Sequence, residues 1–388
     1  MKAVPLLFLL AIAAPLLALL PIGQDPQGGE WAEAVDKAAN ARHYGVRLAT
    51  ARKIAAAGAE PVPAIEAWST AHGRNALPAT LVDTIAQQDG TAPAVVDLLL
   101  RWANDREFYW RTYAFYGLAH RAAALPDRRD RLVELFRAHR DDPAWLVATY
   151  ARFGLVELQA GDDATANPHE DPRIATKLAA LLLENDHDTP LQPLIDALAD
   201  ERTFLGDPWG QRRAADAHRA LKAALGDDHP GGNEDKVAAI TAVRTALEQR
   251  FGSELDQPAL LQDAAVEITG GIEVLSCRNG DLFVEWTADG RIFAGIDARF
   301  VVALPTATWQ ELSQKRAALA LGGELGVVVC DKMRLKWSEP ELHVNVAPAS
   351  LPTAAADWLL ELANALAAAD KTDLADAIRG AVEQFASR

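Results

Sequence analysis

Apolar residues recur every three or four positions along the first two thirds of the chain, a spacing that predicts amphipathic helices. From Glu30 to Gly252 the pattern is almost unbroken, with prolines near the start and glycines at the end of several segments. The stretch Trp31–Ala57 predicts one long helix that Gly58 closes. We therefore expect a helical domain over residues 24–252.

Two segments of this helical region are near copies of each other. TYAFYGLA begins at Thr112, and TYARFGLV begins at Thr149, 37 residues later. An apolar helix and an acidic turn precede each copy, with Asp105 and Asp142 at matching positions, and a looser third copy ends near Gly226. Since one helix pair cannot bury both of its faces, such units are expected to stack on one another.

This unit of helix, Asp-containing turn and helix, with small residues at regular spacing, resembles HEAT-like repeats over about residues 93–226. We favour HEAT over tetratricopeptide repeats because the Trp, Gly, Tyr and Pro pattern of the latter is not matched in order. The resemblance implies an α-solenoid that serves as a binding scaffold.

From about Ala265 the apolar period changes to two, which predicts strands. The segments are GIEVLSC, DLFVEWT, RIFAGI, RFVVALP, ELGVVVCD, MRLKW and ELHVNV, and TADGR supplies the Asp-Gly turn of a hairpin. One helix is inserted at TATWQELSQKRAALALGG, and two helices end the chain. Residues 253–388 should therefore form a smaller α+β domain, which makes the whole chain mainly α.

The C-terminal domain also resembles a small group of uncharacterised exported α+β domains of bacterial lipoproteins. The shared features are Cys277 before DLFVEWTADGRIFAG, the inserted helix, LHVNV and the helix that begins near Ala354. That group carries no assigned chemistry, so the resemblance implies no catalytic residue.

The N-terminus predicts the compartment. Lys2 precedes an uncharged apolar run, Ala3–Ile22, whose 20 residues are enough to span a bilayer. Residues 1–23 are expected to be either a cleaved signal peptide or a retained signal anchor. Both alternatives place the rest of the chain outside the cytoplasm, in the periplasm or cell envelope. A retained segment would anchor the protein to the inner membrane through residues 3–22.

The net charge of the chain limits the classes of partner that it can bind. It has 38 Lys and Arg residues against 54 Asp and Glu residues, a net charge of −16, and no stripe of basic residues. Nucleic acids and anionic lipid surfaces attract the opposite charge, so we expect neither as a partner.

No motif for nucleotide binding or for a catalytic nucleophile is present, and we expect no cofactor. His169, Glu170 and His187, in acidic loops, are weak candidates for a metal site, although such loops are ordinarily polar turns. A metal-dependent hydrolase or lyase therefore remains the alternative to a non-enzymatic protein.

Cys277 and Cys330 are the only cysteines, and both fall on expected strands of the C-terminal domain. An even number of cysteines in an exported domain predicts a disulfide. The alternative is a pair of buried free thiols.

The segment Phe108–Tyr116 holds six aromatic residues in nine positions, more than one helix face can bury. Tyr113 and Tyr116 recur in the second copy as Tyr150 and Phe153, which predicts packing positions for them.

Phe115 recurs as Arg152, a substitution typical of an exposed position. Phe108 lies one heptad before Phe115 and matches Trp145 in the second copy. These four residues predict an exposed strip that binds a protein partner. The alternative is that a neighbouring helix or the C-terminal domain covers the two phenylalanines.

Overall fold

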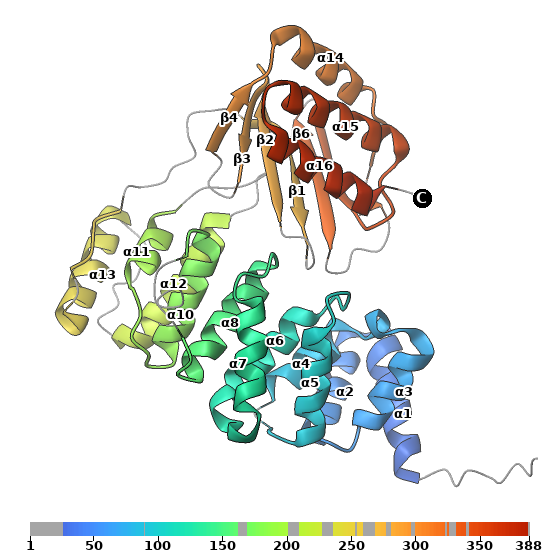
Figure 1. The fold of residues 1–388 in the computed structure, drawn as a ribbon, viewed down its shortest axis with the longest axis vertical. Coiled ribbons are helices and arrows are strands. Elements are labelled where there is room, and N and C mark those ends of the chain that lie inside the picture. Colours follow the sequence, from blue (N-terminus) through green and yellow to red (C-terminus); the bar gives the residue numbers. More distant parts are fainter. Residues whose placement is uncertain are drawn as a thin grey trace, which may run out of the picture.

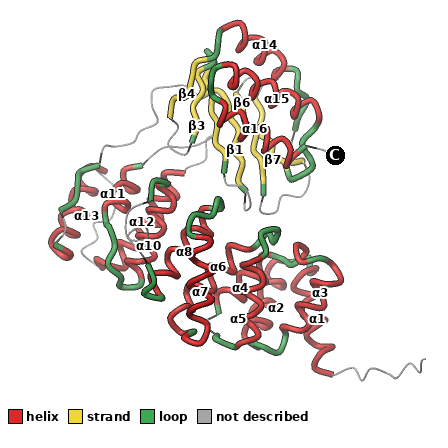
Figure 2. The backbone as a smooth tube through the Cα atoms, viewed as in Figure 1, coloured by secondary structure: helices red, strands yellow, loops and turns green. Residues whose placement is uncertain are grey.

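The chain folds into a helical part followed by a sheet covered by helices (Figures 1 and 2). It is mainly α with a smaller α+β part, as predicted. This computed structural model describes residues 26–88, 90–161, 169–200, 209–226, 236–252, 254–258, 268–276, 281–295, 299–322, 324–325, 331–338 and 341–386. Within these ranges no helix is long and apolar enough to cross a membrane, and the predicted segment 1–23 lies outside them.

The helical part is built from paired antiparallel helices. In chain order these are α1 (Pro26–Asn40), α2 (Tyr44–Ala56), α3 (Val62–His72), α4 (Ala79–Gln87), α5 (Pro93–Asn104), α6 (Arg111–Arg121), α7 (Arg129–His139), α8 (Trp145–Glu157), α10 (Pro172–Glu184), α11 (Gln192–Ala199), α12 (Trp209–Leu225) and α13 (Lys236–Phe251).

The expectation of a single helix over Trp31–Ala57 is wrong. The chain leaves the helix before His43, whose backbone is extended, and resumes as α2. Because α1 and α2 then pack against each other, Val35 and Ile54 enter one core. A continuous helix would have kept these two apolar residues about 28 Å apart at 1.5 Å per residue.

One series of helices runs through the whole helical part. Helices α2, α4, α6, α8, α10 and α12 contact one another in succession, and we call this series the inner row. Helices α5, α7 and α11 pack on α6, α8 and α12 of the inner row, and α3 packs on α1 and α5. The near copies in the sequence, Thr112–Ala119 and Thr149–Val156, fall on α6 and α8, adjacent members of this row.

Two glycines allow close packing of α6 and α8 on their neighbours. A Cβ atom at Gly154 would lie 2.3 Å from the ring of Phe136 on α7, and one at Gly117 would lie 2.9 Å from the carbonyl oxygen of Ala86 on α4. Both distances are below ordinary van der Waals contact. The two glycines are 37 residues apart and hold the same repeat position, but they pack against different helices.

Replacing either glycine with leucine should therefore overpack a helix contact. We expect Gly117→Leu and Gly154→Leu each to lower the free energy of unfolding by about 1–3 kcal/mol in urea titrations. Gly380→Leu, on a helix of the C-terminal part, is the control, because a Cβ there meets nothing within 4 Å. Equal midpoints for all three variants would show that the helices do not depend on these glycines.

Aspartates in the turns lock one unit to the next. Arg111 donates through two nitrogens to both carboxylate oxygens of Asp142, at 2.8 and 2.9 Å. Arg74 forms the equivalent ion pair with Asp105, one repeat earlier. Each aspartate also accepts a hydrogen bond from the backbone N–H two residues later. We call these two pairs the turn locks; they recur with the 37-residue offset of the sequence copies.

The C-terminal part contains one sheet, in the order β4-β3-β2-β1-β6-β7-β5. Its elements are β1 (Ile268–Leu275), β2 (Leu282–Thr287), β3 (Arg291–Ala294), β4 (Arg299–Ala303), α14 (Thr306–Ala317), β5 (Glu324–Leu325), β6 (Lys332–Ser338), β7 (Glu341–Val346), α15 (Thr353–Ala368) and α16 (Thr372–Phe385). Neighbouring strands are antiparallel except β5 and β7. The predicted Asp-Gly hairpin joins β2 to β3, and Gly290 has the positive φ (83°) that such a turn requires.

Helices α14, α15 and α16 pack on one face of this sheet (Figure 1). Alternate residues of β1, β2 and β6 point into the core between them, which period-two patterning predicts. Three tryptophans fill the centre of this core. The ring of Trp358 lies 5.6 Å from that of Trp286 and 6.0 Å from that of Trp337.

Among the described residues, Arg173 joins the two parts. Arg173, near the start of α10, forms ion pairs with Asp171 beside it and with Asp281 just before β2. Its guanidinium lies between two rings, 5.3 Å from the centre of Trp145 and 5.5 Å from that of Phe283. We call this group the junction. Burial raises the pKa of Asp281 despite the opposing effect of Arg173.

Candidate functional site

The predicted strip of exposed aromatic residues is wrong. Phe108 and Phe115 are 1% and 0% exposed. Phe108 stacks on Trp102 with ring centres 5.4 Å apart, and Phe115 meets Phe136 at 6.2 Å. Both phenylalanines belong to the core, so a neighbouring helix covers them, as the alternative interpretation held.

Arg152 explains why the exchange of Phe115 for arginine in the second copy does not indicate an exposed position. It is only 4% exposed, so it does not belong to an exposed strip either. Its Nε donates to the carbonyl oxygen of Arg140 at 2.9 Å, and its Nη2 donates to Asp141 at 2.6 Å. A buried position can therefore hold arginine when the head group reaches a polar turn. Trp145 is half-buried and lies under the guanidinium of Arg173.

The aromatic residues that do reach the surface of the inner row are tyrosines. Tyr113 and Tyr116 on α6 and Tyr150 on α8 are half-buried, and Tyr44 at the start of α2 is 58% exposed. These are four of the five tyrosines in the chain. Tyr113 and Tyr150 hold the same repeat position, which was expected to be packing. Their recurrence was the available signal, because tyrosine suits a site that is apolar at one end and wet at the other.

Ring contacts continue from these tyrosines along the inner row. Tyr116 meets Tyr150 edge-on at 5.3 Å and His120 at 4.4 Å. His120 then meets Phe153 at 5.0 Å, and Phe153 meets His187 at 6.4 Å. Burial among these rings lowers the pKa of His120. The contacts bridge α6, α8 and the loop after α10.

Carboxylates surround the tyrosines. Asp83 on α4 is half-buried, and burial raises its pKa although Gln87 donates a hydrogen bond to it at 2.9 Å. Burial, and after it the negative charge of Asp83, raises the pKa of Tyr113. Burial also raises the pKa of Tyr150, with Asp216 on α12 and Asp83 contributing. We call Tyr44, Asp83, Tyr113, Tyr116 and Tyr150 the tyrosine face.

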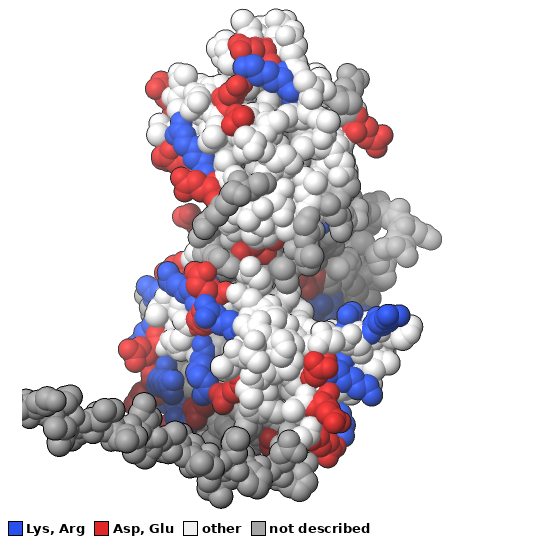
Figure 3. All heavy atoms as spheres, turned by 90° about the vertical axis from the view of Figure 1, so that its right-hand side faces the viewer, with Lys and Arg blue, Asp and Glu red and all other residues white. Residues whose placement is uncertain are grey.

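Ion pairs occupy the other end of the inner row. Asp216 accepts from Lys177 at 3.2 Å and from Arg219 at 2.6 Å, and Arg219 also reaches Glu184 at 3.0 Å. The carboxylates of α10 and α12 thus form ion pairs, whereas Asp83 on α4 accepts a hydrogen bond from the neutral side chain of Gln87. On the side that Figure 3 shows, basic and acidic residues are intermixed and neither forms a broad patch.

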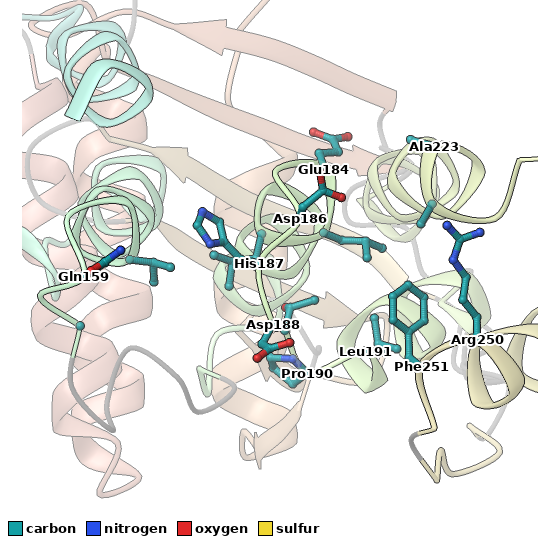
Figure 4. A pocket seen from close by; sticks show the side chains of 16 residues that line it. Gln159, Glu184, Asp186, His187, Asp188, Pro190, Leu191, Ala223, Arg250 and Phe251 are labelled. Carbon is teal, nitrogen blue, oxygen red and sulfur yellow. The ribbon is translucent and has the colours of Figure 1, made fainter. Parts of the chain in front are cut away.

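A cavity of about 1060 Å³ lies beside this end of the inner row (Figure 4). The loop after α10 supplies Asp186, His187 and Asp188, and the end of α13 supplies Arg250 and Phe251 across from them. His187 Nε2 lies 2.7 Å from Glu157 Oε1, so the imidazole is oriented by a carboxylate.

The metal candidates do not come together. His169 Nδ1 accepts a hydrogen bond from the backbone N–H of Asp171 at 2.9 Å. His187, which lines the cavity, is hydrogen-bonded to Glu157. Glu170 is exposed in the same loop as His169. Within the described ranges no three His, Cys, Asp or Glu side chains are placed to hold a metal ion.

The predicted disulfide lies outside the described residues. Neither Cys277 nor Cys330 falls in the described ranges. The bridge stays a prediction: thiol labelling of the denatured, unreduced protein should find neither thiol reactive, and two reactive thiols would refute it.

Comparison of the chain with protein-family models, curated proteins and solved structures found no match. A function for this site is therefore inferred from the chemistry of its own residues.

Proposed function

We propose that this protein is an exported interaction scaffold, a HEAT-like α-solenoid that binds a protein partner along its inner row. The tyrosine face carries the proposal. Tyrosine is enriched where proteins bind one another because its ring buries apolar area at low entropic cost while its hydroxyl stays hydrogen-bonded. Here four tyrosines on α2, α6 and α8 of the inner row are half-buried or exposed, and Tyr116 and Tyr150 are in ring contact across α6 and α8.

The repeated turn locks and glycines support the solenoid. The turn locks recur with the 37-residue offset of the sequence copies, and stacked repeat units produce the extended concave surfaces that solenoids use for binding. The apolar run behind Lys2 supports export, and the acidic composition opposes nucleic acid as the partner.

Site-specific crosslinking in intact cells tests this function. A photo-reactive amino acid would replace Gln87 on α4 of the inner row or, as the control, Glu134 on α7 of the opposite side; both are exposed. We expect a discrete adduct with another protein from position 87 only. Adducts of equal yield from both positions, or from neither, would contradict the proposal.

A reporter fusion tests export alone. A reporter that is active only outside the cytoplasm should be active when joined after Gly29. Activity of a matched cytoplasmic reporter alone would exclude the exported location.

A further inference from the structure

We propose that the cavity beside the end of the inner row binds a short apolar peptide whose termini are both free. The ammonium group of the peptide faces Asp186 and Asp188 on one wall, and its carboxylate faces Arg250 on the other (Figure 4). This site is separate from the tyrosine face, because none of the described residues that line the cavity belongs to that face.

Four helices end at the cavity. It is lined by Val156 of α8, Leu183 of α10, Ala224 of α12 and Phe251 of α13, each in the last turn of its helix. The carbonyl groups at the end of a helix carry a partial negative charge that acts within about one turn. The cavity therefore favours a cationic group, which the ammonium end of a peptide supplies.

The loop after α10 adds carboxylates to one wall. Asp186 and Asp188 are exposed at the cavity, and neither has an ion-pair partner among the described residues. The third carboxylate of the described lining, Glu184, is already paired with Arg219. His187 is hydrogen-bonded to a carboxylate of α8. Asp186 and Asp188 are thus available to a cationic group of a ligand.

The opposite wall carries the opposite charge. Arg250 is exposed there with its guanidinium 5.7 Å from the ring centre of Phe251, and it forms no ion pair with a described residue. Phe251 is itself 43% exposed, and the buried Leu183 and Leu191 add apolar surface to the lining. A simple cation matches only the acidic wall. A molecule with an ammonium group, an apolar body and a carboxylate matches the whole lining.

The size of the cavity and one hydroxyl group favour a peptide over a single amino acid. The cavity volume of about 1060 Å³ is slightly above the usual range for small-molecule sites, about 300–1,000 Å³. Thr189 also lines the cavity, and its buried Oγ1 has no hydrogen-bond partner among the described residues. Because buried hydroxyl groups are nearly always hydrogen-bonded, a backbone N–H or C=O group of a bound peptide suits this position.

Isothermal titration calorimetry with the full-length chain tests peptide binding. The probe is the tripeptide Leu-Ala-Leu with free termini. The references are the N-acetylated tripeptide, which lacks the ammonium group, the C-amidated tripeptide, which lacks the carboxylate, and free leucine. We expect each blocked tripeptide to bind about five- to tenfold more weakly than the free one, because each loses one charge-assisted contact. Leucine should also bind more weakly than the free tripeptide.

A variant at each wall locates the termini of the peptide. Arg250→Gln should weaken binding of the free tripeptide about five- to tenfold but leave the C-amidated tripeptide unchanged, because that peptide has no carboxylate to lose. Arg137→Gln is the matched control. Arg137 is likewise an exposed arginine in the last turn of its helix, α7, and it does not line the cavity.

At the acidic wall, Asp186→Asn combined with Asp188→Asn should weaken the free tripeptide by a similar factor and leave the N-acetylated tripeptide unchanged. Asparagine also tolerates the positive φ of Asp186, 57°. The matched control is Asp127→Asn combined with Asp130→Asn, two exposed aspartates outside the cavity lining.

Any of four results refutes the peptide site: no saturable binding of the free tripeptide, equal binding of the free and end-blocked tripeptides, leucine binding as tightly as the tripeptide, or equal effects of the cavity variants and their controls. The scaffold function is judged separately by the adduct from position 87, because Gln87 on α4 does not line the cavity. The cavity variants should leave the yield of that adduct unchanged.

Discussion

Replacing Arg111 with methionine should lower the free energy of unfolding by about 3–5 kcal/mol, the usual cost of leaving one member of a buried ion pair alone. The side chains of Arg111 and Asp142 are 2% and 0% exposed. Without the guanidinium, Asp142 keeps only His139 and the N–H of Ala144 as donors. Urea unfolding of the variant and the parent protein measures the loss.

The other turn lock is the control. Arg74 and Asp105 hold equivalent positions one repeat earlier, but their side chains are 50% and 26% exposed. Arg74→Met should therefore cost no more than about 1 kcal/mol, as for exposed ion pairs. The double variant Arg111→Met, Asp142→Leu should recover part of the stability, because no buried charge is left unpaired. Equal costs for Arg74→Met and Arg111→Met would refute this account of burial.

Acid should weaken the same lock in the parent protein. Burial alone would raise the pKa of Asp142, but hydrogen bonds from His139 and Arg111 lower it to about 2 from its ordinary 3.8. A depressed carboxyl pKa stabilises the fold above the unfolded pKa, and that contribution is lost as the pH falls from about 4 toward 2. Arg111→Met should show a smaller loss over this range.

Replacing Arg173 with methionine should also cost about 3–5 kcal/mol, and it should separate the unfolding of the two parts. Asp281, whose side chain is 5% exposed, would keep one hydrogen bond, from the N–H of Ser276. Because Trp145 and Phe283 stack on the same guanidinium, the variant also loses both ring contacts across the junction. We expect two calorimetric transitions for the variant and one for the parent protein.

The cost of Arg173→Met should depend on pH in the same direction as that of Arg111→Met, but through a carboxyl group whose pKa is raised. Burial already raises the pKa of Asp281 with Arg173 present, and removing the cation raises it further. A protonated Asp281 needs no partner, so the cost of Arg173→Met should shrink as the pH falls through that raised pKa. Arg291→Met, which breaks an exposed pair with Asp289, is the control and should change little at any pH. A cost independent of pH would mean that ring contacts alone hold the junction.

The elements of this fold follow from spacing, because burying one face imposes a period of about 3.6 on a helix and of two on a strand. The 37-residue repeat further predicted close packing at Gly117 and Gly154, and both leave no room for a Cβ atom, although Gly117 packs on α4 and Gly154 on α7. Spacing did not reveal the break before His43. The residues there are ordinary helix formers, and the turn exists because α1 and α2 gain a shared core.

The site was less predictable because exposure depends on what other elements cover. Phe115 and Arg152 occupy one repeat position, and both are buried: one ring packs in the core, and one guanidinium reaches the turn at Asp141. Asp83 lies outside the near-identical copies, on α4, so no repeat position pointed to it. The junction joins residues 108 positions apart, which no local pattern reports.

The turn locks and the junction differ in how far apart along the chain their partners stand. Arg111 and Asp142 are 31 residues apart, as are Arg74 and Asp105, whereas Arg173 and Asp281 are separated by 108. Contacts of short sequence separation form early, and a chain emerging N-terminus first can complete each lock before its C-terminal third exists. The helical units can thus assemble in order as they are synthesised. The sheet docks last, and Arg173 forms its ion pair with Asp281 only at that stage.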